Sequence, residues 1–196
     1  MHRPYIQDHG RIHDLARLIH HGKLTSVCVA GVKAENGLAL EGGLHQQIAD
    51  VLYDNSALHN ATFVINRGTD DGVVRGNVVV SMDNKLAGIV IDAGGNFARV
   101  RALTDSDSNI AVRVAGTPVY GFLAGNGTNT PSIGFFSDPQ FQPSAGLRLI
   151  TSNISGVLPN GIFVGEMIND TDVKTISARE LSRVMVLKFD NLGEYR

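Results

Sequence analysis

Serine, histidine and aspartate are the side chains here from which hydrolytic chemistry could be built, because a nucleophilic serine needs a histidine base and a carboxylate that orients it. His45 with Asp50, and His59 with Asp70, could supply base and orienting group. Such serines usually stand in turns of the form Gly-x-Ser-x-Gly or Gly-Asp-Ser-Gly. The nearest segment, Asn-Ile-Ser-Gly at 153–156, matches neither form. The sequence therefore predicts no catalytic residues, and a cryptic hydrolase stays only as an alternative.

Candidate metal ligands occur in two places. His9 and His13 are four residues apart but have no third ligand near them in the sequence, which makes a weak zinc site. The alternating oxygen side chains at 105–109 (Asp-Ser-Asp-Ser-Asn) resemble a calcium loop, without its central glycine or its distal glutamate. Turn capping by aspartate explains that segment better. We therefore expect no metal and no cofactor.

Composition excludes several classes of function. The 196 residues are 43% hydrophobic and 18% charged, which is ordinary for a globular protein. A net charge of −2 provides no basic surface for nucleic acid. The single cysteine, Cys28, allows no intrachain disulfide and no thiolate metal cage. The sequence contains no apolar run of the ~20 residues that span a bilayer, so a membrane anchor is expected only upstream of this chain.

The segment from Asp8 to His21 predicts a helix, because Ile12, Leu15 and Ile19 recur at spacings of three and four. Its apolar face could pack on its own domain. It could equally be the last two turns of a coiled coil that continues upstream.

After Gly22 the chain predicts an all-β body, since short apolar runs alternate with turns rich in Gly, Asn, Asp and Pro. Segments 71–92 and 146–169 share one glycine-marked pattern and suggest two related modules. The expected strands are Thr25–Ala30, His45–Tyr53, Ala61–Asn66, Asn77–Met82, Lys85–Ile91, Ala98–Leu103, Ile110–Val114, Tyr120–Ala124, Ser132–Phe136, Leu147–Thr151, Ile162–Ile168 and Arg183–Lys188.

Four segments, read in order, resemble the extracytoplasmic domain of the MreC family of rod shape-determining proteins. The most specific is 150–165, Ile-Thr-Ser-Asn-Ile-Ser-Gly-Val-Leu-Pro-Asn-Gly-Ile-Phe-Val-Gly, which is similar to the family's Val-Thr-Ser-Gly-x-x-Gly-x-Phe-Pro-x-Gly-x-x-Val-Gly signature. The others are the Ile-Asn-Arg-Gly-Thr-Asp-Asp-Gly-Val turn at 65–73, the pair of strands Gly-Asn-Val-Val-Val at 76–80 and Leu-Ala-Gly-Ile-Val at 86–90, and Ala-Arg-Val-Arg-Ala-Leu-Thr-Asp-Ser-Asp-Ser at 98–108.

The resemblance implies two small six-stranded β-barrels with the architecture of chymotrypsin-like proteases but without catalytic residues, preceded by a short N-terminal helix. We expect a helix and linker over 1–45, a first barrel over 46–112 and a second over 113–196, and the barrels may exchange strands. Six residues are expected to set turns and strand entries: Gly68, Gly72, Gly76, Pro159, Gly161 and Gly165.

The function implied by the resemblance is a non-enzymatic scaffold of the bacterial cell-elongation machinery. Members of the family self-associate, and they bind and activate a class B penicillin-binding protein. They also link this synthase with RodA, MreD and MreB. They lie on the periplasmic face of the inner membrane, anchored by an upstream helix. The alternative is a stand-alone β-barrel module that binds a peptide or a glycan.

Two sets of residues are candidates for these contacts. Ile12, Leu15 and Ile19 would carry self-association through the coiled coil. Phe135, Phe136 and Phe141, near a proline-rich loop, would anchor a partner, because aromatic side chains are favoured in interfaces. Packing in an ordinary barrel core is the alternative role for the three phenylalanines.

Replacing Leu15 and Ile19 with aspartate tests the coiled coil. The double variant should be monomeric at concentrations where the parent chain is dimeric, because buried charge at core positions opposes helix pairing. Light scattering coupled to size exclusion measures the mass. Self-association that persists unchanged would show that this helix is not the contact.

Overall fold

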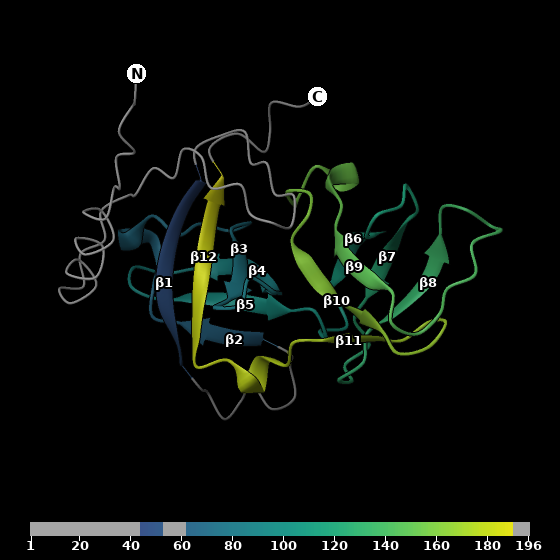
Figure 1. Ribbon diagram of the computed structural model, residues 1–196. Coiled ribbons are helices and arrows are strands. Elements are labelled where there is room, and N and C mark those ends of the chain that lie inside the picture. The colour runs from purple at the N-terminus through teal and green to yellow at the C-terminus, as the bar shows by residue number, and fades with distance from the viewer. Residues whose placement is uncertain (1–43, 53–61, 190–196) are drawn as a thin grey trace, which may run out of the picture.

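The computed structural model describes residues 44–52 and 62–189, and these form an all-β protein, as predicted (Figure 1). Three short 3-10 helices lie between the strands: η3 (Thr69–Asp71), η4 (Asn153–Ser155) and η5 (Ala178–Glu180). The expected helix over 8–21 and the expected strand Thr25–Ala30 lie outside the described residues. The strands are β1 (Leu44–Leu52), β2 (Thr62–Ile65), β3 (Val78–Ser81), β4 (Leu86–Ala93), β5 (Ala98–Ala102), β6 (Asn109–Val114), β7 (Tyr120–Ala124), β8 (Ser132–Phe136), β9 (Arg148–Thr151), β10 (Phe163–Met167), β11 (Val173–Thr175) and β12 (Arg183–Phe189).

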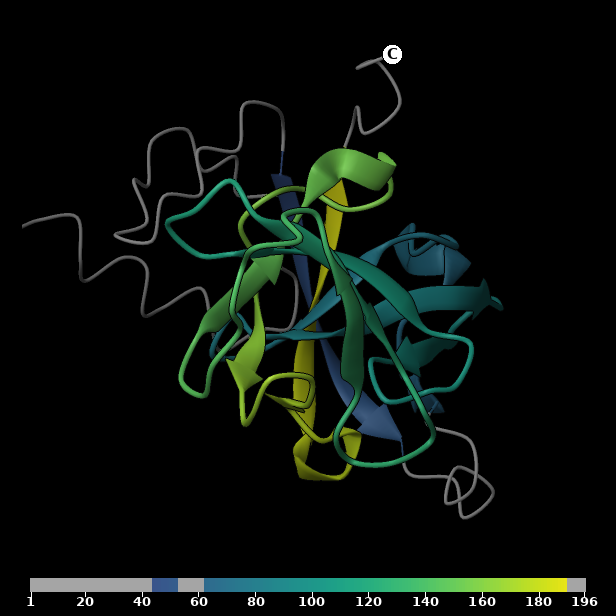
Figure 2. The same cartoon turned by 90° about the vertical axis from the view of Figure 1, so that its right-hand side faces the viewer.

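The strands form two six-stranded units that lie side by side, which confirms the predicted fold class (Figure 1). The first is a closed antiparallel barrel in the order β1-β12-β3-β4-β5-β2. The second is a curled open sheet in the order β11-β10-β9-β6-β7-β8, seen end-on in Figure 2. Its two edge strands meet at one end, where the Ile133 N–H donates to the Thr171 carbonyl at 2.8 Å and the Val173 N–H donates to that of Pro131 at 2.9 Å.

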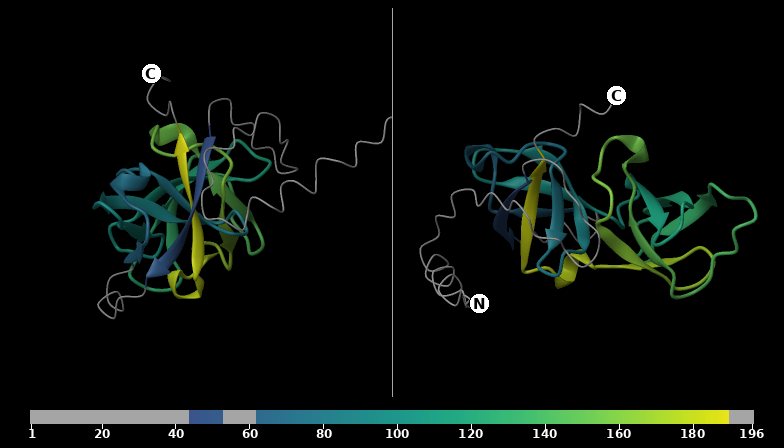
Figure 3. Two further views of the ribbon diagram at one scale, coloured as in Figure 1. Left: turned by 90° about the vertical axis from the view of Figure 1, so that its left-hand side faces the viewer. Right: turned by 45° about the horizontal axis from the view of Figure 1, so that its top comes forward.

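The last strand returns to the first unit, which differs from the division at 112 and 113. β12 runs between β1 and β3, paired with both, so it closes the barrel that the earlier strands begin. Without β12 both neighbours would expose unpaired backbone edges. The second unit therefore consists of residues from Asn109 to Thr175, and the chain crosses between the units twice, as the right view of Figure 3 shows.

Besides the core inside the barrel, a second hydrophobic core contains side chains of both the barrel and the second sheet, and we call it the shared core. All four residues of β3 are buried, which is expected of a strand that is covered on both faces. Val79 points into the barrel core, whereas Val78 and Val80 belong to the cluster that contains the second sheet. Leu86 of β4 and Leu187 of β12 join the same cluster. The outer face of three barrel strands is thus the inner wall of a second core.

The first crossing between the units is fixed by buried and hydrogen-bonded residues. Leu103 is 1% exposed and lies in the shared core. The Gly125 N–H donates to the Ser108 carbonyl at 2.9 Å, and the Gly127 N–H donates to that of Thr104 at 2.8 Å. In the second crossing, Leu181 packs in the barrel core. The first crossing is therefore tied to both units, and the second is anchored in the barrel.

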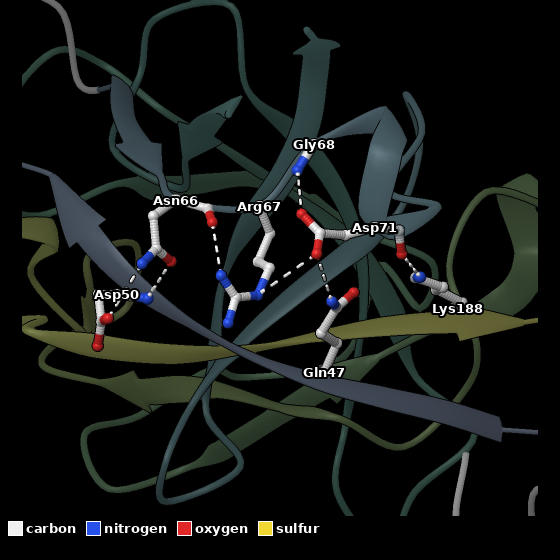
Figure 4. A network of polar contacts seen from close by, with 7 residues as sticks. All are labelled: Gln47, Asp50, Asn66, Arg67, Gly68, Asp71 and Lys188. Atoms are coloured by element: carbon white, nitrogen blue, oxygen red, sulfur yellow. Dashed lines mark hydrogen bonds and ion pairs between the residues drawn. The ribbon is translucent and has the colours of Figure 1, made fainter. Parts of the chain in front are cut away.

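The turn at 66–72 is tied to the barrel by a polar network (Figure 4). The Asp71 carboxylate accepts hydrogen bonds from the Gly68 N–H at 3.1 Å and from Gln47 Nε2 at 3.3 Å, and pairs with Arg67 Nε at 3.8 Å. Lys188 Nζ donates to the Asp71 backbone oxygen. Burial lowers the pKa of the Lys188 amine, an effect that the Asp71 charge partly offsets. The network joins the turn to β1 and β12.

Gly68 is required by a close backbone approach. Thr69 and Asp70 donate their N–H groups to the carbonyls of Gly94 and Gly95, at 2.7 and 2.8 Å. A Cβ atom at Gly68 would lie 2.6 Å from the Gly95 oxygen and closer still to that of Gly94. A side chain at this position would therefore separate the two loops.

Leu86→Ala tests the shared core. Leu86 is fully buried, and its truncation should lower the free energy of unfolding by about 2–5 kcal/mol. Urea unfolding should show one transition for both units, because the lost contacts belong to both. Val74→Ala is the control, since Val74 is 53% exposed and its truncation should cost less than about 0.5 kcal/mol. Two separate transitions, of which only one shifts, would contradict the shared core.

Candidate protein-binding surface between the two β units

The described residues that were considered for catalysis and metal binding do not form a site, and His9 and His13 lie outside the described residues. His45 and Asp50 lie on β1, and Ser152 caps η4 by accepting a hydrogen bond from the Ile154 N–H. Asp105 accepts a hydrogen bond from the Asp107 N–H at 2.9 Å, as expected of a turn cap. Within residues 44–52 and 62–189, no group of three His, Cys, Asp or Glu side chains could hold a metal ion. His59 lies outside the described residues.

An open apolar groove of about 240 Å³ lies where the two units meet. We call it the inter-unit groove. It has walls from both units: Ile89 of β4 on the barrel side, and strands β6 and β7 with the loop around η4 on the other. Its lining residues are Ile89, Asn109, Ile110, Ala111, Phe122, Ser155, Val157 and Leu158.

Thr151 fixes the loop that forms one wall of the inter-unit groove. Its side chain is completely buried, and its hydroxyl donates to the Pro159 carbonyl at 2.6 Å and accepts from the Ile162 N–H at 2.9 Å. Gly161 closes the loop with a φ of 97°, a conformation that side chains disfavour. The loop is therefore held at both ends by one buried hydroxyl.

This fixed loop exposes apolar side chains beside the groove. Ile154 and Val157 are each 52% exposed. Phe122, on the outer side of β7, is 38% exposed and lies opposite Ala111 in the strand register. Asn109 contributes a polar group to the lining. Because the loop is already ordered, burying these side chains against a partner costs little conformational entropy.

The shape of the inter-unit groove favours a protein partner. Its volume lies below the range of roughly 300–1,000 Å³ that is usual for small-molecule pockets. Ser155 and Asn109 are the polar side chains of its lining, which is too few to match the hydroxyls of a sugar. The groove has room for one or two apolar side chains of another protein, and exposed apolar groups surround it.

Of the three phenylalanines that the sequence nominated, one is exposed. Phe135 on β8 is 56% exposed. Phe136 and Phe141 contact each other with tilted rings whose centroids are 5.2 Å apart, and both pack against the shared core. Phe122, which sequence reasoning missed, occupies an outward position between buried Gly121 and Leu123. The signal in the sequence that could have identified Phe122 is its place at a solvent-facing position of a strand with alternating burial.

The other residues predicted to have a role are the turn and strand-entry residues and those of the N-terminal helix. Gly72 and Gly76 have φ values of 71° and 94° and lie in turns. Pro159 is buried in the loop after η4, and Gly165 lies in β10, where a Cβ atom would strike the Lys174 carbonyl of β11. Ile12, Leu15 and Ile19 lie outside the described residues. In the part of the chain that the structure describes, no helix is long and apolar enough to cross a bilayer.

Comparison with known proteins supports one family throughout. The family model of the rod shape-determining protein MreC, barrel core, matches residues 51–194. The cell shape-determining protein MreC of Caulobacter vibrioides is 30% identical over 138 residues, which make up 69% of this chain and 39% of the relative. This chain therefore spans well under two thirds of that relative's length.

Two solved structures show the same fold. MreC from Pseudomonas aeruginosa superposes with a TM-score of 0.65 at 21% identity, covering 74% of this chain and 99% of the other. The second is a complex between a penicillin-binding protein (PBP2) and MreC from Helicobacter pylori, with a TM-score of 0.58 at 17% identity, covering 76% of this chain and 99% of the other. At these identities the likeness is one of fold alone.

The family match covers more than half of the chain and includes the turn at 66–72 and the loop at 152–161, whose structural roles are described above. The family is a structural, shape-determining one and not a family of enzymes, which confirms the prediction of a non-enzymatic protein. The chain belongs to the MreC family of cell shape-determining proteins.

Proposed function

We propose that this chain is a scaffold of the bacterial cell-elongation machinery that binds a class B penicillin-binding protein through the inter-unit groove. The single observation that carries the proposal is a preformed apolar groove whose walls come from both units. The complex of an MreC relative with PBP2 supports the choice of partner. The proposed location is the periplasmic face of the inner membrane, which the family resemblance implies.

This scaffold would act by binding the synthase and not by catalysing a reaction. Phe122 of β7 and Val157 of the loop after η4 line the side of the groove that the second unit provides, and each would gain by burial against an apolar side chain of the synthase. Ile89 lines the barrel side and Ala111 the side of the second unit, and they are half-buried and buried, so they would provide shape rather than flexibility. A synthase held in one orientation by a rigid surface can be kept in its active conformation, since a ligand favours the state that it binds better.

The other contacts of the machinery stay proposals. Self-association is assigned to Ile12, Leu15 and Ile19, on the helical pattern of the sequence alone. RodA, MreD and MreB are proposed as partners by family resemblance. Phe135 is proposed as an additional partner contact, because it is a large exposed aromatic on the edge strand β8.

Phe122→Ser and Val157→Asp test the inter-unit groove. Each should weaken binding of the purified class B penicillin-binding protein from the same organism at least about 10-fold, because central apolar contacts contribute 1.4 kcal/mol or more. Biolayer interferometry with the synthase immobilised measures the dissociation constant.

Phe97→Ser is the matched control, because Phe97 is 48% exposed on the barrel and is not a groove residue. It should leave affinity unchanged. Phe135→Ser shows whether the surface extends to β8. Unchanged binding by both groove variants would contradict the proposal, and a loss confined to Phe135→Ser would move the site to the sheet edge.

A further inference from the structure

A second apolar surface lies on the outer face of the barrel, on the side away from its core. Ile48 and Leu52 of β1 are 41% and 46% exposed. Ile48 lies opposite Met185 of β12, and Leu52 lies opposite Val64 of β2, both half-buried. We call these four residues the β1 stripe. β1 and β12 are paired along their length and lie side by side in Figure 1.

Charge within the β1 stripe is neutralised. Asp50 lies between Ile48 and Leu52 on the same face of β1, and its carboxylate pairs with Arg183 Nε of β12 at 3.2 Å. Both charged side chains are more than half exposed, so the pair is held at the surface. The stripe therefore consists of two apolar pairs separated by an ion pair with no net charge, and an uncharged helix face can cover it.

The sequence that leads into β1 contains a matching surface. Ile12, Leu15 and Ile19 lie on one face of the helix predicted over 8–21. The eight residues from Ile12 to Ile19 extend over about 10 Å of helix, and the five residues from Ile48 to Leu52 extend over about 13 Å of strand. A helix of this length is marginal in water by itself, so it needs an apolar surface on which to pack.

Chain connectivity brings the two surfaces together. The 22 residues from Gly22 to Gly43 separate the end of the predicted helix from Leu44, where β1 begins. They can span up to roughly 70 Å, far more than the distance of about 13 Å from Leu44 to Ile48 along the strand. Tethering on this scale gives an effective concentration on the order of millimolar.

We propose that residues 8–21 dock their apolar face on the β1 stripe of the same chain. Docking covers Ile12, Leu15 and Ile19, the residues assigned to self-association, so one helix cannot make both contacts at once. The docked form is a closed monomer, and self-association requires the helix to leave the barrel. The contact is thus autoinhibitory. It is independent of synthase binding at the inter-unit groove.

Trypsin cleavage after Arg17 tests the docking. In dilute solution, where light scattering shows a monomer, cleavage of the whole chain should be at least about 10-fold slower than that of a synthetic peptide of residues 1–24, because proteolysis follows the population of the open state. Ile48→Gln with Leu52→Gln should remove most of this protection. Val74→Gln, at another exposed apolar position, should keep it.

The double variant should still unfold in one cooperative urea transition, with a free energy of unfolding lower by about 1.4 kcal/mol, which is the 10-fold docking equilibrium converted to free energy; a much larger loss would indicate damage to the barrel itself. Cleavage of the parent chain at the peptide rate would overturn the proposal. So would protection that survives in the double variant, since the helix would then lie elsewhere. Protection that grows with protein concentration would place the helix on a second copy and would equally overturn docking within one chain.

Discussion

Packing of the barrel's outer face against the second sheet is the contact on which the rest of the structure depends. Val78 and Val80 alternate with Val79, so that one short strand supplies two cores. Leu86 and Leu187 extend the shared core across neighbouring strands. A hydrophobic core that belongs to two units cannot be kept when they separate, because separation would expose it to water. The orientation of the units is therefore part of folding itself, and the inter-unit groove, which has a wall from each unit, exists only because that orientation is fixed.

The same constraint supports the proposed scaffold function. A scaffold must present its contacts in one arrangement, and here buried backbone partners hold the arrangement. Thr151 holds the loop that displays Ile154 and Val157, and the tight approach at Gly68 holds the turn beside β1 and β12. At both positions a residue of a family motif has a structural role and not a catalytic one. The apolar surfaces that remain, the inter-unit groove and the β1 stripe, lie on different parts of the molecule. The proposed partner binding and the proposed control of self-association would therefore use separate contacts.

Much of the fold could be predicted from the sequence, because alternation and glycine-marked turns are local signals. The strands predicted at Asn77–Met82 and Lys85–Ile91 agree with the observed bounds of β3 and β4 to within two residues. β11, with three residues and one buried side chain, is too short for a period to be read. The partnership of β12 with β1 links residues more than 130 positions apart, and local pattern does not encode it. The inter-unit groove was missed for the same reason, since Ile89, Ala111 and Val157 come from three separate segments. The aromatic cluster near 135–141 was visible in the sequence, but which ring faces solvent depends on the packing of Phe136 on Phe141.

Native-state hydrogen exchange tests the shared core most directly. The slowest amides of β3 in the barrel and of β6 in the second sheet are compared in increasing, sub-denaturing urea. Our account predicts that both sets exchange with the same free energy and the same urea dependence, because both are released only by global unfolding. If the amides of one unit exchanged through an opening lower by about 2 kcal/mol or more while the other stayed protected, the units would fold independently and the account would be contradicted.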